Sequence, residues 1–458
     1  MKRHMPVRPE RRSTAMIPLL AVAGAGTGMF LLARSARPAP TASHEPRAPH
    51  RVVIVGAGFG GLMAAQSLGG VPGVHVTLID ERNHHLFQPL LYQVATGMLN
   101  PDEIASPVRA IMAGQHRVTP LMATVSGIDL DRREVRCAGR TLPYDTLVLA
   151  TGSQVSYFGH DSWHESALGL KTLDDALLLR RRILTSLEQA AKATSPAERD
   201  QHLTFVLVGG GTTGVEMAGA IAELTHEVLT QEFQGRPELR AKVILLEAGP
   251  TLLAGFDSDL AARATRDLRR MGVDVRTGTK VEDIQPDRVS LGRERITANT
   301  IVWTAGVAAT PVAEWLGLKP AKGGRVAVGA DLQVPGRPGV YVIGDAALAL
   351  DRHGKPLPGV AAVAKQQGAY VARAVRRAMR GSRSTPPFHY RDYGTMATVG
   401  RNSAVAEIGG IHLKGFAGWL TWAVAHIFFL IGFRNRVLVS AQWLFSYVTH
   451  RRSGRVIT

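Results

Sequence analysis

The chain has 458 residues, of which 45% are hydrophobic and 20% are charged. A chain of this length and composition can bury large cores, so we exclude disorder for its bulk and expect two or three domains. The single cysteine, Cys137, excludes a disulfide framework, a cysteine zinc site and any mechanism that needs a redox-active cysteine pair. No HExxH or clustered-cysteine pattern is present, so we expect no metal.

The net charge of +17 is concentrated at the two ends of the chain. Residues 1–51 carry nine Lys and Arg against two acids, and residues 410–458 carry six and no acid. Both ends also contain long apolar stretches. Positive charge beside apolar surface favours an anionic membrane as the partner, and no nucleic-acid recognition signature is present.

Residues 1–49 are predicted to be a basic N-terminal extension. Within it, residues 15–33 form an uncharged run, and nineteen helical residues would reach about 28 Å, roughly one bilayer core. The run is rich in Gly and Ala and contains Pro18. Four interpretations stay open: a transmembrane anchor, a cleaved signal, a targeting segment, or translation of an upstream start that is not used.

A strand, a glycine-rich turn, a helix and a second strand ending in an acid occur next. Residues 52–55 are a β-branched run, residues 56–61 contain four glycines, and a helical pattern starts at Leu62. Residues 74–79 read as the second strand, which ends at Asp80, 24 residues after the first glycine. This order is typical of a dinucleotide-binding unit.

The same unit recurs downstream. Residues 203–208 are an apolar strand, residues 209–214 the glycine-rich turn, residues 215–224 a helix, and residues 243–246 a strand that ends at Glu247. Because Glu247 comes 38 residues after Gly209, we expect a longer helix or an insertion here. The first glycines of the two turns are 153 residues apart, which indicates an internal duplication.

Each turn has the chemistry that a pyrophosphate needs. The first glycine permits the tight turn, the second lets the backbone approach the phosphates, and the third lets helix and strand pack closely. The helix N-terminus presents free N–H groups, and the acid can accept hydrogen bonds from ribose hydroxyls. The predicted ligands are Gly56, Gly58, Gly61 and Asp80 at one site, and Gly209, Gly211, Gly214 and Glu247 at the other.

Two dinucleotides in one chain imply a flavin and a nicotinamide, and two further patterns support the flavin. Residues 339–345 read as a strand ending in Gly344 and Asp345, before residues 346–350, which we predict to be helical. A carboxylate there can bind ribityl hydroxyls. Residues 149–152 and 303–306 each end an apolar strand, where we expect the chain to cross between domains.

These motifs resemble the two-dinucleotide-binding-domain flavoproteins, and within that group the type II NADH dehydrogenases, which are non-proton-pumping NADH:quinone oxidoreductases. The segments that carry the resemblance are residues 83–97, 213–216, 358–367, 393–401 and 415–458. The resemblance covers roughly residues 51–458. It implies an α/β fold with two Rossmann-like domains, for FAD and NADH, and a C-terminal amphipathic helical membrane-binding segment.

The resemblance also implies domain bounds and site residues. The FAD-binding domain is expected in two parts, residues 50–165 and 311–392, with the NADH-binding domain, residues 166–310, between them and a C-terminal membrane-binding region over residues 393–458. FAD is expected to bind noncovalently, and NADH as the substrate. The implied FAD contacts are Gly56, Gly58, Gly61, Asp80, Thr151, Gly152, Gly344 and Asp345, and the implied NADH contacts are Gly209, Gly211, Gly214 and Glu247.

Three residues are implied near the reacting groups. The family's version of Glu216 is a candidate proton-relay or gating carboxylate, and the alternative is an acid in the first turn of a helix that offsets the helix dipole. Residues 358–367 are implied to line the quinone pocket with Gln366 and Gln367, although Ala362 stands where many family members have Gln.

The resemblance implies hydride transfer from NADH to flavin N5 and two-electron reduction of a membrane quinone. Because NADH is cytoplasmic, we expect a peripheral protein on the cytoplasmic face of a bacterial-type inner membrane. Residues 415–432 and 437–448 are expected to form helices in the interface, or core or dimer helices, and they could serve a homodimer and a membrane alike. We expect removal of residues 410–458 to release the protein and leave the flavin domain folded.

Three alternatives stay open. A sulfide:quinone oxidoreductase keeps the fold but needs several cysteines. A ferredoxin-type reductase leaves the Trp-rich C-terminal end unexplained. A degenerate flavin-binding scaffold would keep the glycines without turnover.

Overall fold

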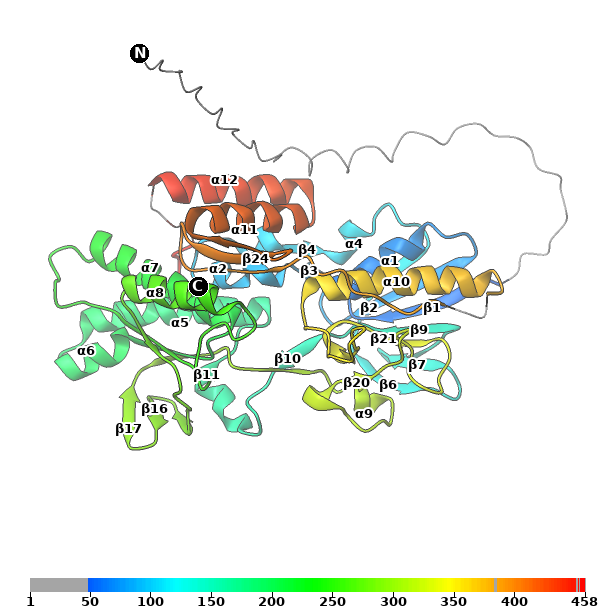
Figure 1. Cartoon of the computed structure of the whole chain (residues 1–458), viewed down its shortest axis with the longest axis horizontal. Helices are drawn as coiled ribbons and strands as arrows, with labels where there is room; N and C mark the ends of the chain where they lie inside the picture. Colours follow the sequence, from blue (N-terminus) through cyan, green and yellow to red (C-terminus); the bar gives the residue numbers. More distant parts are fainter. Residues whose placement is uncertain (1–47, 383–384, 450–451, 453, 458) are drawn as a thin grey trace, which may run out of the picture. The chain divides into compact units, whose positions relative to one another are not determined.

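The structure, a computed structural model, describes residues 48–382, 385–449, 452 and 454–457. Residues 15–33, and with them the question of an N-terminal membrane segment, lie outside the described residues. Two parallel sheets carry the two dinucleotide-type units, and three strands and two helices follow at the C-terminal end (Figure 1).

The first sheet has five parallel strands in the order β21-β9-β1-β2-β5. Its strands are β1 (His50–Val55), β2 (Val74–Asp80), β5 (Val118–Met122), β9 (Thr146–Leu149) and β21 (Val340–Val342). Four of the strands come before residue 150, and β21 joins them after an excursion of the chain through the second sheet. The first sheet is therefore complete only after that excursion.

Both faces of this sheet are covered, which explains why residues 52–55 of its central strand are all apolar. Val52 and Ile54 face the helices α1 (Phe59–Gly69) and α10 (Ala361–Met379). Val53 and Val55 face a core shared with the antiparallel strands β6 (Val125–Asp129), β7 (Glu134–Cys137) and β8 (Arg140–Pro143). Because side chains alternate along a strand, each face receives every second residue.

The second sheet repeats this plan in the order β11-β18-β12-β13-β14, again all parallel. Its strands are β11 (Ala167–Leu168), β12 (Thr204–Val208), β13 (Lys242–Leu246), β14 (Val273–Arg276) and β18 (Thr300–Trp303). One face packs on the helices α5 (Leu173–Lys192), α7 (Thr212–Gln231) and α8 (Ser258–Arg270). The other face packs on β15 (Asp283–Gln285), β16 (Arg288–Leu291) and β17 (Glu294–Thr297). The duplication read from the sequence is therefore a duplication of structure.

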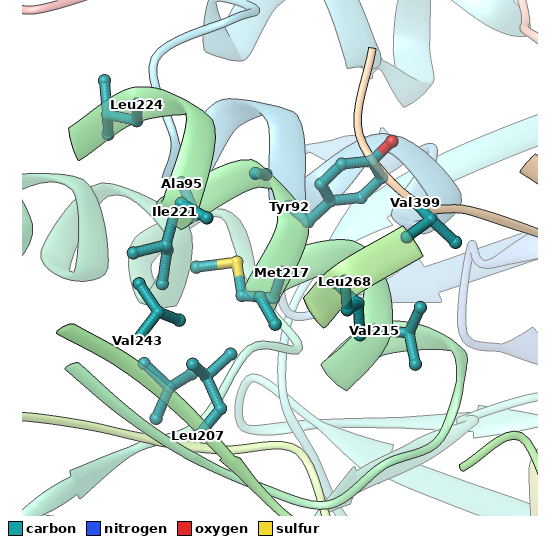
Figure 2. Close-up of a cluster of buried hydrophobic side chains, with 14 of the residues drawn as sticks. Tyr92, Ala95, Leu207, Val215, Met217, Ile221, Leu224, Val243, Leu268 and Val399 are labelled. Atoms are coloured by element: carbon teal, nitrogen blue, oxygen red, sulfur yellow. The ribbon is translucent and has the colours of Figure 1, made fainter. Parts of the chain in front are cut away.

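The core on the helical face of the second sheet also reaches the first unit. In Figure 2, Leu207 and Val243 of the sheet lie below Met217 and Ile221 of α7. Tyr92 and Ala95 belong to the short helix α2 (Leu91–Ala95), in the loop that follows β3 (His84–Leu86), and they share this cluster. The loop after Asp80 is thus built into the core of the second sheet.

The two segments at which the chain crosses between the sheets pair with each other. Residues Ser153–Val155 form β10 and residues Val307–Ala309 form β19, and the two strands are antiparallel. They follow directly after Gly152 and Gly306, where we expected the crossings.

Two sequence predictions need comment. Residues 346–350 are not helical: Gly344–Ala346 is one 3₁₀ turn, and β22 (Ala347–Leu348) pairs with β20 (Val326–Ala327). The segment is too short to hold a helix against this pairing, so tertiary context overrides helix propensity. The longer spacing before Glu247 comes from a longer helix and a longer connection. Helix α7 has 20 residues and α1 has 11, and residues 232–241 join α7 to β13, whereas residues 70–73 join α1 to β2.

The C-terminal region begins with a three-stranded antiparallel sheet that the sequence reading missed: β23 (Thr395–Thr398), β24 (Ala404–Ile408) and β25 (Ile411–Lys414). Two helices follow, α11 (Gly415–Phe429) and α12 (Phe433–Thr449), which we call the C-terminal hairpin. Within the described residues, no helix is both long enough and apolar enough to cross a bilayer.

The C-terminal hairpin is apolar on two sides. Trp422, Leu430 and Val439 are buried in the same core cluster as α2 and α7. Removal of residues 410–458, which we expected to release the protein and leave the flavin domain folded, would also uncover this core.

Helices α1 and α10 pack so closely that one contact leaves no room for a side chain. A Cβ at Gly368 would lie 2.2 Å from the carbonyl oxygen of Gly60. We expect Gly368→Ala to lower the free energy of unfolding by about 1–3 kcal/mol, because overpacking forces the helices apart. Thermal denaturation measures this, with the exposed Arg377→Ala on the same helix as a control; equal melting temperatures would contradict the prediction.

Candidate functional site

The first glycine-rich turn joins β1 to α1, and two of its glycines are required by packing. Gly56 has φ +102°, and a Cβ there would lie 2.3 Å from the carbonyl oxygen of Ala150. A Cβ at Gly61 would lie 1.8 Å from the carbonyl oxygen of Gly56. Gly58, at the N-cap of α1, has no atom within 4 Å of its Cβ position. The open space therefore lies where a phosphate would approach the helix N-terminus.

The second turn, between β12 and α7, repeats this geometry. Gly209 has φ +111°, with a Cβ position 2.5 Å from the backbone of Ala305. The Cβ position of Gly214 again lies 1.8 Å from the carbonyl oxygen of the first glycine, and that of Gly211 has nothing within 4 Å. The two turns are thus the same structure made twice, each with one open glycine at a helix N-cap.

The acids after β2 and β13 turn towards these loops. Asp80 Oδ2 accepts a hydrogen bond from the backbone N–H of Ala57 at 2.6 Å. Glu247 Oε2 accepts one from Gly210 at 2.6 Å, and its Oε1 accepts one from Gly249 at 2.5 Å. Each carboxylate keeps lone pairs for further donors, as ribose binding requires.

The structure brings Asp345 to the first crossing segment. Asp345 Oδ2 accepts a hydrogen bond from Ser153 Oγ at 2.6 Å, and Lys171 Nζ lies 3.6 Å from the same oxygen. Gly344 adopts φ +70° just before it, and Thr151 bonds Thr310 through the two hydroxyls at 2.6 Å. The sequence reading missed Ser153 and Lys171, because no motif marks them.

The two glutamines assigned to the quinone pocket both have backbone partners. Gln367 is buried, and its Oε1 accepts a hydrogen bond from the N–H of Gly344 at 2.6 Å. Gln366 Nε2 donates to the carbonyl of Arg391 at 2.8 Å, and its Oε1 accepts from the N–H of the same residue at 3.0 Å. The amides therefore hold the Gly344–Asp345 turn and the segment before β23.

The loop after Asp80 places an unpaired imidazole nitrogen beside the first turn. His85 Nδ1 lies 3.0 Å from the carbonyl oxygen of Ala57, while its buried Nε2 has no hydrogen-bond partner. Burial lowers the pKa of His85 to about 4, so the ring is neutral at pH 7. Nearby, Lys365 of α10 is partly buried, which lowers its pKa, and its Nζ lies 5.1 Å from the ring centre of Phe429. An orphaned polar atom and open backbone at one turn fit a bound dinucleotide.

Glu216 lies one turn into α7, as the fifth residue of the helix, so the dipole interpretation does not apply. Its Oε1 is 3.4 Å from the backbone N–H of Thr398, which is a weak hydrogen bond. Burial raises the pKa of Glu216 to about 8, so the carboxyl is mostly protonated at pH 7. Glu216 is therefore an acid that holds a proton at neutral pH.

A small cavity separates Glu216 from the C-terminal hairpin. It has a volume of about 40 Å³, and Glu216, Tyr92, Trp422, Trp443 and Ser446 are among the residues that line it. Trp422 Nε1 and Ser446 Oγ are buried without partners. A space of this size can hold two or three waters, which these groups could bind.

Hydrogen bonds connect the hairpin to the neighbourhood of Glu216 beside this cavity. Trp443 Nε1 donates to Gln93 Oε1 at 2.7 Å, and Gln93 Nε2 donates to the hydroxyl of Tyr92 at 3.0 Å. Tyr92 bonds the hydroxyl of Thr398 at 2.9 Å, and the backbone of Thr398 faces Glu216. Only the tertiary structure reveals this connection, because its members are up to 350 residues apart.

Two family models match the chain. The pyridine nucleotide-disulphide oxidoreductase family matches residues 50–368, and the NDH2 C-terminal domain matches residues 393–452. The only cysteine, Cys137, is buried and has no second cysteine to pair with, so the disulfide chemistry in the first name does not extend to this chain. The second match covers β23 to α12.

Two curated relatives of the chain are type II NADH:quinone oxidoreductases. It is 42% identical over 434 residues to type II NADH:quinone oxidoreductase Ndh of Mycobacterium tuberculosis, an alignment that covers 92% of each chain. It is 40% identical over 436 residues to NdhA of the same organism, covering 91% of this chain and 92% of the relative.

Solved structures share the fold. NDH2 from Plasmodium falciparum, solved in complex with NADH, matches with a TM-score of 0.81 at 20% identity, over 90% of this chain and 100% of that one. The sulfide:quinone oxidoreductase of Aquifex aeolicus matches with a TM-score of 0.67 at 18% identity, over 88% of this chain and 96% of that one. The near-complete alignments with the mycobacterial enzymes decide between these two: the chain belongs to the type II NADH:quinone oxidoreductases, flavoenzymes that bind FAD and oxidise NADH.

Proposed function

We propose that the first glycine-rich turn of this NADH:quinone oxidoreductase holds FAD and that the second holds NADH. When bound, FAD supplies the redox chemistry, accepting a hydride from NADH and passing two electrons to a quinone. The repeated geometry, in which Gly58 and Gly211 alone of each glycine triplet are open, supports two dinucleotide sites. The observation that carries their assignment is Asp345, which follows β21 of the first sheet and can bind the ribityl hydroxyls of a flavin there. The proposed FAD ligands are Gly56, Gly58, Gly61, Asp80, Thr151, Gly152, Gly344 and Asp345, and the proposed NADH ligands are Gly209, Gly211, Gly214 and Glu247.

The chain's own residues bind and orient the two dinucleotides. The N-termini of α1 and α7 offer N–H donors to the pyrophosphates. Asp80 and Glu247 are positioned for ribose hydroxyls, and Asp345 for the ribityl chain. We propose that the parts of the chain that hold FAD are residues 50–165 and 311–392, and that residues 166–310 hold NADH.

We propose that the quinone approaches along α10 and the C-terminal hairpin. Lys365 Nζ lies over the ring of Phe429 of the hairpin, and the charge of Lys365 helps to lower the pKa of His85. Gln366 and Gln367 act as positioning residues, because their amides already hold neighbouring backbone. Glu216 acts as a proton-holding carboxyl in the wall of the cavity beside the C-terminal hairpin.

We propose that the outer face of the hairpin docks the protein on the cytoplasmic face of the membrane. Most of its large exposed side chains are aromatic or aliphatic, and the basic Arg434 and Arg436 are exposed as well. Such a face suits an anionic lipid surface. A second copy of the chain is the other occupant that this face could take. The exposed apolar residues include Phe416, Leu420, Val424, Phe428, Phe433, Val437, Leu444 and Val448.

A matched pair of variants tests the assignment of the turns. Neither Gly58→Ala nor Gly211→Ala meets an atom within 4 Å, so both should fold. We expect Gly58→Ala to lose FAD, and Gly211→Ala to keep its yellow colour but need about tenfold more NADH for half-maximal flavin bleaching, a loss of about 1.4 kcal/mol. Flavin absorbance and stopped-flow bleaching measure the two effects.

Loss of FAD in Gly211→Ala, together with weaker NADH binding in Gly58→Ala, would assign FAD to the second turn and NADH to the first. A wild-type flavin that NADH does not bleach would instead favour the degenerate scaffold.

The raised pKa of Glu216 has a consequence for stability. Its ordinary value is 4.5 and its folded value is about 8, so the folded state binds the proton more tightly. Stability should therefore fall as pH rises from 4.5 to 8, by up to about 1.4 kcal/mol per pH unit, and Glu216→Gln should remove this part of the decline.

Chemical denaturation of the FAD-loaded protein at pH 5.5 and 8.0 measures the difference. The exposed Glu188→Gln on α5 is the control. If Glu216→Gln follows the wild-type pH profile, the carboxyl is already charged in the folded protein.

The membrane proposal predicts that apolar side chains on the hairpin carry the affinity. Phe428 is 62% exposed and Phe433 is 83% exposed. Replacing both with Gln should lower binding to phosphatidylglycerol-containing vesicles by about a hundredfold or more, since burial of each ring contributes about 1.5–3 kcal/mol. Leu178→Gln, on the exposed side of α5, should bind as the wild type does. A double variant that keeps full vesicle binding but halves its mass in light scattering would assign the face to a dimer.

A further inference from the structure

The last described residues of the chain turn back from α12 and enter the protein. Arg452 has a fully buried side chain. Its Nη1 donates to the carbonyl oxygen of Thr96 at 3.1 Å, and its Nη2 donates to Glu223 Oε2 at 3.1 Å. Its Nε lies 3.5 Å from Glu227 Oε2, and its backbone N–H donates to Glu227 Oε1 at 3.1 Å. One guanidinium therefore bridges α7 and the segment that ends α2.

We call residues 452 and 454–457 the C-terminal tail. Further contacts of the tail hold it against the Thr96–Gly97 segment and α7. The N–H of Gly454 donates to the carbonyl oxygen of Gly97 at 3.0 Å. A Cβ at Gly97 would lie 2.6 Å from the carbonyl oxygen of Gly454, so the two backbones touch. Arg455 pairs with Glu232, beyond the end of α7. The tail is thus held at several points along its described length.

The acids that receive Arg452 share a face of α7 with Glu216. Glu216, Ala220, Glu223 and Glu227 are spaced by four, three and four residues, which places them on one side of the helix. Arg401 also donates to this face, through its backbone N–H to Glu223 at 2.6 Å. Buried carboxylates need such partners, and a guanidinium supplies several donors in one rigid plane.

The bridge joins parts that belong to different dinucleotide sites. Thr96 and Gly97 end the loop that starts beside the first turn at His85, whereas α7 begins at the second turn. Reaction between two bound cofactors depends on their spacing, and a displacement of 1 Å can cost about a hundredfold in rate. A rigid link between α7 and the Thr96–Gly97 segment therefore controls the distance between the two bound cofactors, on which the rate of hydride transfer depends.

We propose that Arg452 is a positioning residue, through which the C-terminal tail clamps α7 against the Thr96–Gly97 segment and so sets the spacing of the FAD and NADH sites. The inference rests on the proposed assignment of those sites. Because the tail directly follows α12, the same clamp connects the C-terminal hairpin to the helix that carries Glu216.

Arg452→Lys in the full chain tests the clamp. Lysine keeps the positive charge but cannot reach Thr96, Glu223 and Glu227 with one planar group. We expect this variant to hold FAD as the wild type does, and to show flavin reduction by saturating NADH slowed by about tenfold or more. Arg377→Met, at the exposed end of α10, is the control and should react normally.

The readouts separate the outcomes. A normal rate of flavin reduction in Arg452→Lys would overturn the proposal, and so would a slow rate accompanied by lost FAD, because the arginine would then serve the fold alone. Arg452→Met together with Glu223→Gln leaves fewer unpaired charges, and it should fold but remain slow. If Gly58→Ala keeps FAD and Gly211→Ala loses it, the site assignment fails instead, whatever the rate in Arg452→Lys.

Discussion

The architecture depends on one close approach of backbone atoms, which occurs in both glycine-rich turns. At the third glycine of each turn, Gly61 or Gly214, the missing Cβ would lie 1.8 Å from the carbonyl oxygen of the first glycine. No other residue allows the helix to start so close to the end of the strand. The helix N-terminus therefore lies over the carboxyl edge of its sheet, and Gly58 and Gly211 leave the only open backbone in each triplet. This close approach therefore creates the open backbone at each sheet edge at which a phosphate can bind.

The second organising feature is the helix α7, which contacts the second sheet, the helix α2 and the C-terminal region. Its N-terminus forms the second turn, and its apolar side completes the core below it (Figure 2). Its acidic side binds Arg401 and Arg452 of the C-terminal region. Burial leaves Glu216 mostly protonated at pH 7, whereas Glu223 and Glu227 receive the guanidinium of Arg452. Paired and unpaired carboxyls on one helix face thus have different chemistry because their surroundings differ.

The C-terminal hairpin explains how one short region can be both structural and exposed. Trp422 and Val439 are buried against α2 and α7, while Phe428 and Phe433 face outwards. On the inner side, Trp443 donates a hydrogen bond to Gln93 of α2. A surface bound by the outer side would therefore be coupled to the site through packed and hydrogen-bonded groups, without any spanning helix among the described residues.

The sequence alone determined what is local or repeated: the two glycine turns, the acids after their second strands, and the apolar C-terminal stretches. These are readable because steric rules and periodicity act over a few residues. Only the tertiary structure decided which distant groups meet. Gln366 and Gln367 bind backbone groups far away in the sequence, residues 347–348 pair as a strand where we expected a helix, and Arg452 binds the acids of α7. Such outcomes depend on partners hundreds of residues away, whose positions no local pattern encodes.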